Sequence, residues 1–161
     1  MNLITSNNSF VSNILGKTTN DIFYILYTSI AGSILLAISS KIQIPLTPVP
    51  VTLQTLVLLV MSMLLGWRGA LGATLLYLFQ GAIGLPVFAH GAGLIYLFGP
   101  TGGYLFGFIL ASIVVGFLAE KGWDKSIILT FVTLTIGTLL IYFCGVLWLA
   151  QLKDFNTAIV F

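Results

Sequence analysis

The sequence predicts an all-α membrane protein, a compact bundle of five transmembrane helices with apolar outer connecting loops. Of its 161 residues, 58% are hydrophobic and 6% are charged, whereas soluble domains carry about 25% charged residues. Five apolar runs approach the roughly 20 residues that a helix needs to cross a bilayer. We therefore expect a polar cytoplasmic N-terminal segment over residues 1–22 and a single transmembrane domain over residues 23–161.

The first predicted span, Phe23–Ser40, carries a small residue at every fourth position, which places these residues on one helix face. They are Ser29, Ser33 and Ala37. Small side chains let a second helix approach closely and gain packing contacts. We expect this face to contact another helix, although small residues are common in any membrane helix.

The segment that follows, Ile44–Gln54, contains three prolines between two apolar runs. Proline has no N–H to give to a helix, and its ring forces the preceding residue out of the α region. The segment is therefore an extended connector. Irregular backbone that is this apolar usually lines a cavity at membrane depth; the alternative is a stiff turn between two helices.

Two further spans, Val51–Gly66 and Ala70–Gly84, flank the charged aromatic turn Gly66–Gly69. The second connector, Leu85–Pro100, contains no Lys, Arg, Asp or Glu and is interrupted by glycine. It is too apolar for an exposed loop and too short and broken to span the membrane. We expect it to fold back onto the bundle.

The fourth span opens at the glycine-rich motif Gly99–Tyr104 and runs to about Glu120, and the fifth covers Ser126–Ala150. A proline suits the first turn of a helix, and glycine lets a ligand or another backbone come close. The threonines of the fifth span can bond the carbonyls of their own helix, so they need no functional role.

The distribution of Lys and Arg predicts the orientation in the membrane. Four of these residues, Lys17, Arg68, Lys121 and Lys125, lie on the side of the N-terminus, and Lys41 and Lys153 lie on the other side. Because cytoplasmic loops carry the excess of positive charge, we expect a cytoplasmic N-terminus in a multi-pass protein. Both connectors then face the outside.

Uncharged polar side chains gather at the predicted outer ends of the spans. A buried amide that stays unpaired costs about 1–3 kcal/mol, so such groups at one level indicate a polar ligand. The alternative is that they bond only to protein backbone, and His90 alone is more often a surface or backbone-bonded histidine than a metal ligand. The candidates are Thr47, Thr52, Gln54, Gln80, His90, Tyr96, Thr101 and Tyr104.

Several classes of function lack support in the sequence. There is no phosphate-binding loop of the G-x-x-x-x-G-K-[ST] type, and no catalytic constellation that would indicate an enzyme. The one cysteine, Cys144, has no partner at metal-ligand spacing, and we predict neither a metal nor a cofactor. The net charge of +2 is too small to indicate nucleic acid as a partner.

Three motifs resemble the BioY family of bacterial biotin transport proteins: IPLTPVPVTLQTL, GLPVF followed by GAG, and GPTGGYLFGF. They occur in the family's order and spacing, and the similarity runs from about Ser33 to Ala150. Members are substrate-capture (S) components of energy-coupling-factor (ECF) transporters. The resemblance implies a six-helix protein of the bacterial cytoplasmic membrane that captures biotin from outside. It also implies a transmembrane coupling protein and a pair of cytoplasmic ATPases as partners.

The resemblance also suggests roles for single residues. The Gln54 amide and the hydroxyls of Thr47 and Thr52 would bond the ureido ring, which needs donors and acceptors together. The second connector would close over the ligand with two glycines as hinges. Val49, Phe88, Tyr96 and Tyr104 would pack on the biotin rings and tail, and the hinges would be Gly91 and Gly93. The ligand carboxylate would be bound by Lys41 or by the backbone of residues 101–103, which include Gly102. The coupling protein would dock on Ser29, Ser33 and Ala37.

The sequence departs from the family pattern near its end. Family members continue into a sixth helix that opens with a Pro-Gly-Asp motif and a nearby lysine, and no such motif occurs before Phe161. Two alternatives to biotin uptake therefore stay open: an inactive truncated form, and a pore through an oligomer of the five-span chain. A pore would need a polar stripe along a whole helix.

Overall fold

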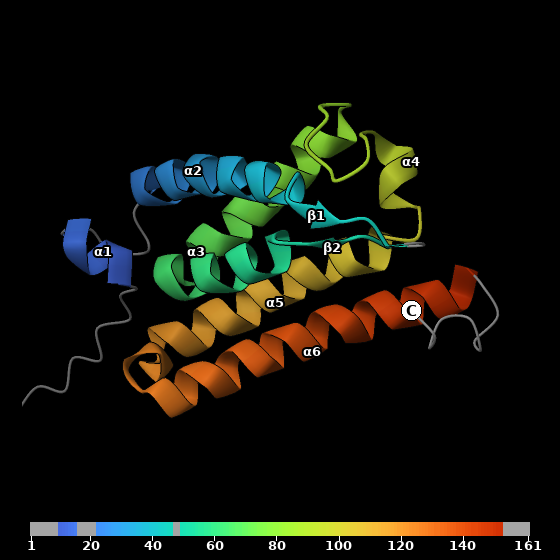
Figure 1. Ribbon diagram of the computed structural model, residues 1–161. Helices are drawn as coiled ribbons and strands as arrows, with labels where there is room; N and C mark the ends of the chain where they lie inside the picture. Colours follow the sequence, from blue (N-terminus) through green and yellow to red (C-terminus); the bar gives the residue numbers. More distant parts are fainter. Residues whose placement is uncertain (1–9, 16–21, 47–48, 153–161) are drawn as a thin grey trace, which may run out of the picture.

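The computed structural model describes residues 10–15, 22–46 and 49–152, and it is a bundle of long helices (Figure 1). Four helices are long and apolar enough to cross a membrane, which confirms the predicted all-α membrane fold. Thr47 and most of the predicted segment 1–22 lie outside the described residues. The elements are α1 (Phe10–Leu15), α2 (Ile22–Ser40), β1 (Gln43–Ile44), β2 (Val51–Thr52), α3 (Gln54–Ala82), α4 (Leu94–Leu97), α5 (Gly102–Glu120), η1 (Trp123–Lys125) and α6 (Ile127–Leu152).

The element α3 contains the second and third predicted spans, joined by a reversal at Gly66. This residue has φ 76° and ψ 173°, which is not helical and which glycine adopts without steric cost. In a straight helix Gln54 and Tyr77 would lie about 35 Å apart, yet both line one pocket. The first half of α3 (54–65) and its second half (67–82) are therefore two helices that turn back on each other, as Figure 1 shows.

Side chains from two other helices satisfy the backbone at this reversal. The Tyr24 hydroxyl of α2 donates to the carbonyl oxygen of Leu65 at 2.9 Å. The Glu120 carboxylate at the end of α5 lies against the backbone of Gly66 and Trp67. Because unpaired backbone groups are costly in lipid, these contacts tie α2 and α5 to the reversal.

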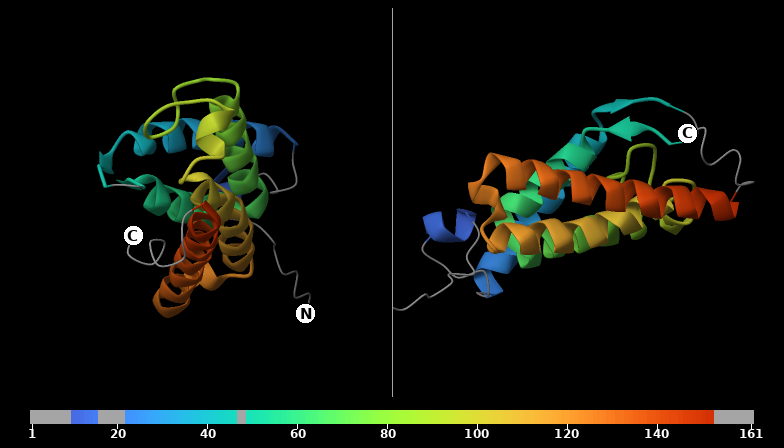
Figure 2. Two further views of the ribbon diagram at one scale, coloured as in Figure 1. Left: turned by 90° about the vertical axis from the view of Figure 1, so that its right-hand side faces the viewer. Right: turned by 90° about the horizontal axis from the view of Figure 1, so that it is seen from below.

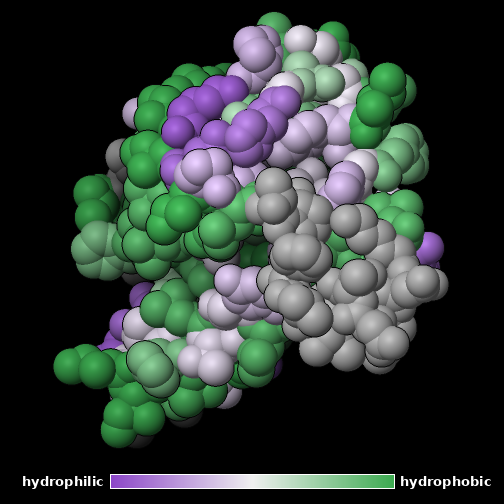
Figure 3. All heavy atoms as spheres, turned by 45° about the vertical axis from the view of Figure 1, so that its right-hand side comes forward, coloured by the Kyte–Doolittle hydropathy of each residue, from purple (hydrophilic) through white to green (hydrophobic). Residues whose placement is uncertain are grey.

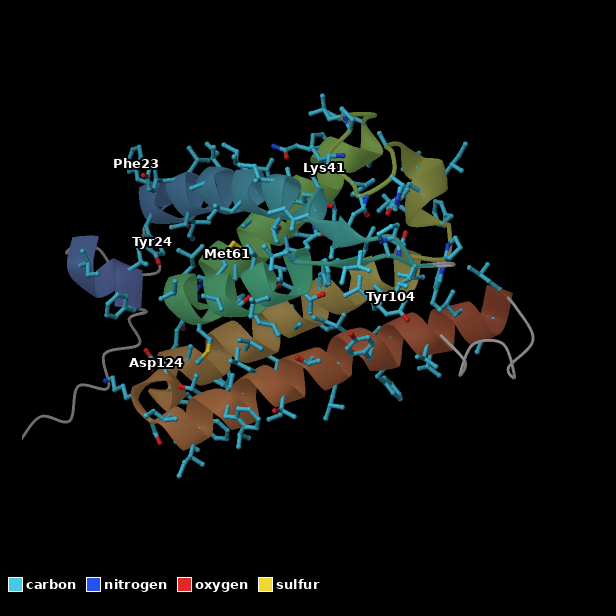
Figure 4. The ribbon with its side chains drawn as sticks, viewed as in Figure 1. Phe23, Tyr24, Lys41, Met61, Tyr104 and Asp124 are labelled. Carbon is cyan, nitrogen blue, oxygen red and sulfur yellow. The ribbon has the colours of Figure 1, made fainter. Side chains whose placement is uncertain are left out.

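Replacing Tyr24 by phenylalanine is expected to lower the free energy of unfolding by about 1 kcal/mol, because the Leu65 carbonyl loses a buried hydrogen bond. Tyr24 is 2% exposed and points into the bundle, whereas its neighbour Phe23 points away (Figure 4). Thermal unfolding in detergent measures the change. Tyr27→Phe is the control, because Tyr27 is 68% exposed on the same helix; an equal shift in both variants would contradict the assignment.

Small residues bring α2 and the second half of α3 into close contact. Ser29 is 9% exposed and Ser33 is fully buried, and a Cβ added to Gly72 would meet the Ser29 hydroxyl. The predicted helix–helix contact therefore forms within the chain. In this chain Ser29 and Ser33 are covered by α3 and Ala37 is half-buried; their role in docking the coupling protein stays a prediction.

The helix α6 packs mainly on α5 and lies at the edge of the bundle (Figure 2). A Cβ on Gly103 would meet Trp148, and one on Gly107 would lie 2.8 Å from the Cα atom of Ile141, so these two glycines of α5 face α6. Along α6, Thr133, Thr135 and Thr138 each donate to the carbonyl four residues earlier. These threonine hydroxyls are therefore paired within their own helix, as expected from the sequence.

The described parts of both connectors lie at one end of the bundle, which we call the connector end (41–46, 49–53 and 83–101). Here β1 and β2 pair in antiparallel register, Gln43 with Thr52 and Ile44 with Val51. The opposite end, which we call the turn end (Gly66 and 121–126), carries Arg68 and the charged residues around η1. Figure 4 shows the separation through its labels for Lys41 and Asp124.

Candidate functional site

A pocket of about 90 Å³ opens at the connector end, between the first connector, the second connector and the helices below them. Its lining mixes hydroxyl, amide, aromatic and aliphatic side chains, and none of the described lining residues is charged. Figure 3 brings the connector end forward and shows hydrophilic groups beside hydrophobic surface. The lining residues are Val49, Pro50, Val51, Thr52, Gln54, Thr55, Tyr77, Ala89, Tyr96, Thr101, Tyr104, Leu105, Phe108, Ile141 and Tyr142.

The most informative lining group is the amide of Gln54. This residue begins α3 and is 4% exposed, and its side chain lies beside the Tyr77 hydroxyl. Its amide nitrogen makes no hydrogen bond to any described residue. Since buried amides are nearly always paired, this N–H₂ group is a donor available to a ligand in the pocket.

Six of the predicted ligand-binding residues come together in this pocket. They belong to four separate segments, the first connector, the start of α3, α4 and the start of α5, which meet at the connector end. Their contact with a ligand stays a prediction. The six are Val49, Thr52, Gln54, Tyr96, Thr101 and Tyr104.

Four other predicted residues do not line the pocket. Gln80 places its amide nitrogen 3.5 Å from the Ser33 hydroxyl, inside the helix contact. Phe88 is fully buried behind the pocket, and Gly102 borders a separate depression between α5 and α6. His90 is exposed, with its Nε2 atom 3.2 Å from the Gln43 amide nitrogen. This agrees with the expectation that it is a surface histidine.

The two predicted hinge glycines have backbone angles that favour glycine. Gly91 has φ 151° and Gly93 has φ 90°, a region that other residues rarely adopt. Gly93 also donates its N–H to the Gly81 carbonyl at 2.7 Å. The second connector is therefore bonded back to the end of α3, and a hinge role for the two glycines stays a prediction.

Reasoning from the sequence missed the remaining lining residues, which are Pro50, Val51, Thr55, Tyr77, Ala89, Leu105, Phe108, Ile141 and Tyr142. For Tyr77 a signal was present, since it lies three residues before Gln80 on one helix face near the same end. No comparable signal marks Phe108 or Ile141, because an apolar residue in a membrane helix looks the same whether it faces lipid or a pocket.

Comparisons with known proteins agree with the family resemblance of the three sequence motifs. The sequence profile of the BioY family matches residues 11–161. The biotin transporter BioY2 of Lactococcus lactis is 40% identical over 134 residues, which cover 81% of this chain and 71% of that protein. The probable biotin transporter BioY of Pyrococcus horikoshii is 35% identical, over 78% of this chain and 74% of that protein.

The match to the biotin transporter BioY of Thermotoga maritima is 49% identical but covers 54% of this chain and only 52% of that protein. A crystal structure of the S-component for biotin from an ECF-type ABC transporter has the same fold, with a TM-score of 0.70. That match has 23% identity and covers 86% of this chain and 78% of the other. The resemblance drawn from the three motifs is confirmed: this chain belongs to the BioY family.

Proposed function

We propose that this protein captures biotin at the outer face of the bacterial cytoplasmic membrane, as the substrate-binding subunit of an ECF-type transporter. Its family and the names of its relatives support this function. The observation that carries the proposal is the uncharged polar pocket with the unpaired Gln54 amide nitrogen at its wall.

The chemistry of the pocket suits a cyclic urea joined to an apolar body. A ureido group presents one carbonyl acceptor and two N–H donors, and the Gln54 amide can both donate and accept. Hydroxyls of Thr52, Thr101 and Tyr104 add further partners, while Phe108 and other apolar lining groups supply packing for the ring and chain. Lys41 lies outside this lining, and its Nζ atom is bonded to a backbone carbonyl, so it is not our choice for the ligand carboxylate.

The partners in this proposal are the coupling protein and the ATPase pair, which would supply the energy for transport. The N-terminus would be cytoplasmic, since Arg68, Lys121 and Lys125 lie at the turn end and Lys41 alone of the described cations lies at the connector end. A pore through an oligomer is less well supported, because the polar lining is confined to one end of the bundle.

Equilibrium binding of radiolabelled biotin to the full chain in detergent tests the proposal. We expect saturable binding that unlabelled biotin competes and that pimelate, which has a similar acid chain but no ureido ring, does not. Absence of saturable binding in a folded preparation would refute biotin capture by this chain.

The orientation has its own test with single cysteines in a Cys144→Ala background, since Cys144 is the only native cysteine. An impermeant thiol reagent added to intact cells is expected to label Ala92→Cys at the connector end. Ser126→Cys at the turn end is expected to react only after the membrane is permeabilised. The reverse pattern would place the pocket on the cytoplasmic side and exclude uptake from outside.

A further inference from the structure

Two side chains at the end of α2 bind the backbone of the second connector. The Ser40 hydroxyl lies 2.7 Å from the carbonyl oxygen of Val87, and the Lys41 ammonium donates to the carbonyl oxygen of Phe88 at 2.6 Å. Hydrogen bonds from a charged donor are shorter and stronger than neutral ones. These residues are 47 positions apart in the sequence, so the bonds fix where the connector lies on the bundle.

The residue held at this point, Phe88, lies between the connector backbone and two tyrosines of the pocket. Its ring packs edge-on against Tyr77, with centroids 5.4 Å apart at 79°, and stacks on Tyr96, with centroids 4.8 Å apart at 14°. Phe88 is 0% exposed and is not among the pocket-lining residues, whereas both tyrosines are. It touches the rings that would touch a ligand.

The end of α3 is shaped to accept this ring. A Cβ added to Gly81 would collide with the Phe88 ring, so glycine is required there. The Tyr77 hydroxyl also donates to the Val87 carbonyl at 3.3 Å, the same oxygen that lies beside Ser40. The connector backbone, the Phe88 ring and the pocket tyrosines are thus one connected set of contacts.

We propose that Phe88 is a positioning residue for the ligand pocket, and that Lys41 holds it there through the Phe88 carbonyl. Phe88 fixes the ring planes of Tyr77 and Tyr96, and these rings confine the bound ligand. The inference rests on the proposed function, because biotin is the ligand used to measure it. The sequence suggested that Phe88 and Lys41 contact the ligand. The proposal instead gives them a positioning role.

Two variants test Phe88 separately from general stability. Phe88→Leu removes the stacking on Tyr96 and is expected to raise the Kd for radiolabelled biotin roughly tenfold, mainly through faster dissociation. Val115→Ala is the matched core control, since Val115 is 0% exposed and does not line the pocket. It should lower the unfolding temperature and leave Kd unchanged.

Lys41 gives an independent test that does not disturb the core. Lys41→Met should speed biotin dissociation several-fold without lowering the unfolding temperature as Val115→Ala does, and Lys41→Arg should restore the wild-type rate because it still donates to the Phe88 carbonyl. Lys121→Met is the control for loss of charge, since Lys121 lies over the Phe117 ring at the turn end.

The outcomes separate the two proposals. If the folded wild-type protein does not bind biotin, the proposed function fails. If the wild-type protein binds biotin and both Phe88→Leu and Lys41→Met bind and release it as Val115→Ala and Lys121→Met do, the positioning role is refuted and biotin capture stands. Should Phe88→Leu fail to fold, Lys41→Met with its arginine rescue decides the question alone.

Discussion

Replacing Gln54 by leucine is expected to weaken biotin binding strongly and, at the same time, to stabilise the protein without biotin. A ligand carbonyl that loses its donor inside a closed pocket costs about 1–3 kcal/mol, which is roughly 5- to 150-fold in Kd. Without a ligand, the same amide nitrogen has no hydrogen-bond partner among the described residues. Removing a buried unpaired polar group is favourable, so the unfolding temperature should rise.

The two opposite signs make this prediction specific. Equilibrium binding measures the loss, and thermal unfolding without biotin measures the gain. Gln80→Leu is the matched comparison, because the Gln80 amide lies at Ser33 and outside the pocket lining; its Kd should stay near that of the wild type. Equal losses of affinity in both variants would argue against the pocket as the ligand site.

Replacing Gly116 by alanine is expected to destabilise the bundle by about 3 kcal/mol, the upper part of the usual range for added volume in a packed core. The new Cβ would meet the backbone N and Cα atoms of Trp67 and lie 2.7 Å from the carbonyl carbon of Gly66. Backbone cannot rotate away as a side chain can. Here the backbone is also held in place by the Tyr24 hydrogen bond at the reversal.

Thermal unfolding and the yield of folded protein in detergent measure this effect. Val114→Ile is the control, because it adds volume to α5 at a half-buried position and should change the unfolding temperature little. If Gly116→Ala unfolds at the wild-type temperature, then the contact between α5 and the Gly66 reversal is looser than the structure indicates.

The helices were predictable because hydrophobic length and helix breakers act locally. The first span begins within one residue of α2 and ends with it, the fourth ends with α5 at Glu120, and the two connectors fall between helices as expected. The reversal at Gly66 also followed from the sequence, since a Gly-Trp-Arg-Gly turn divides two apolar runs. What the sequence could not give was the side of each helix that faces protein rather than lipid.

The same limit applies to the placement of residues at the site. In water a polar face marks the outside of a helix, but in lipid both faces are apolar, so Phe88 looked like a ligand contact although it lies behind Tyr77 and Tyr96. Ser29 of α2 faces α3 within the chain, and whether this face also docks a partner stays a prediction. The role of Lys41 depends on a carbonyl 47 positions away, and no local pattern reports such a contact.

The length of the first half of α3 sets how deep the pocket lies. Residues 54–65 rise by only about 18 Å at 1.5 Å per residue, whereas the hydrocarbon layer is about 30 Å thick. If the Gly66 reversal lies at one boundary of this layer, Gln54 lies well beneath the other boundary, in surroundings of low dielectric constant. Hydrogen bonds formed there are electrostatically stronger than in water, and dissolved salt does not screen them as it screens exposed charges. A ligand that binds there must lose its hydration shell, which favours an uncharged group at the depth of Gln54.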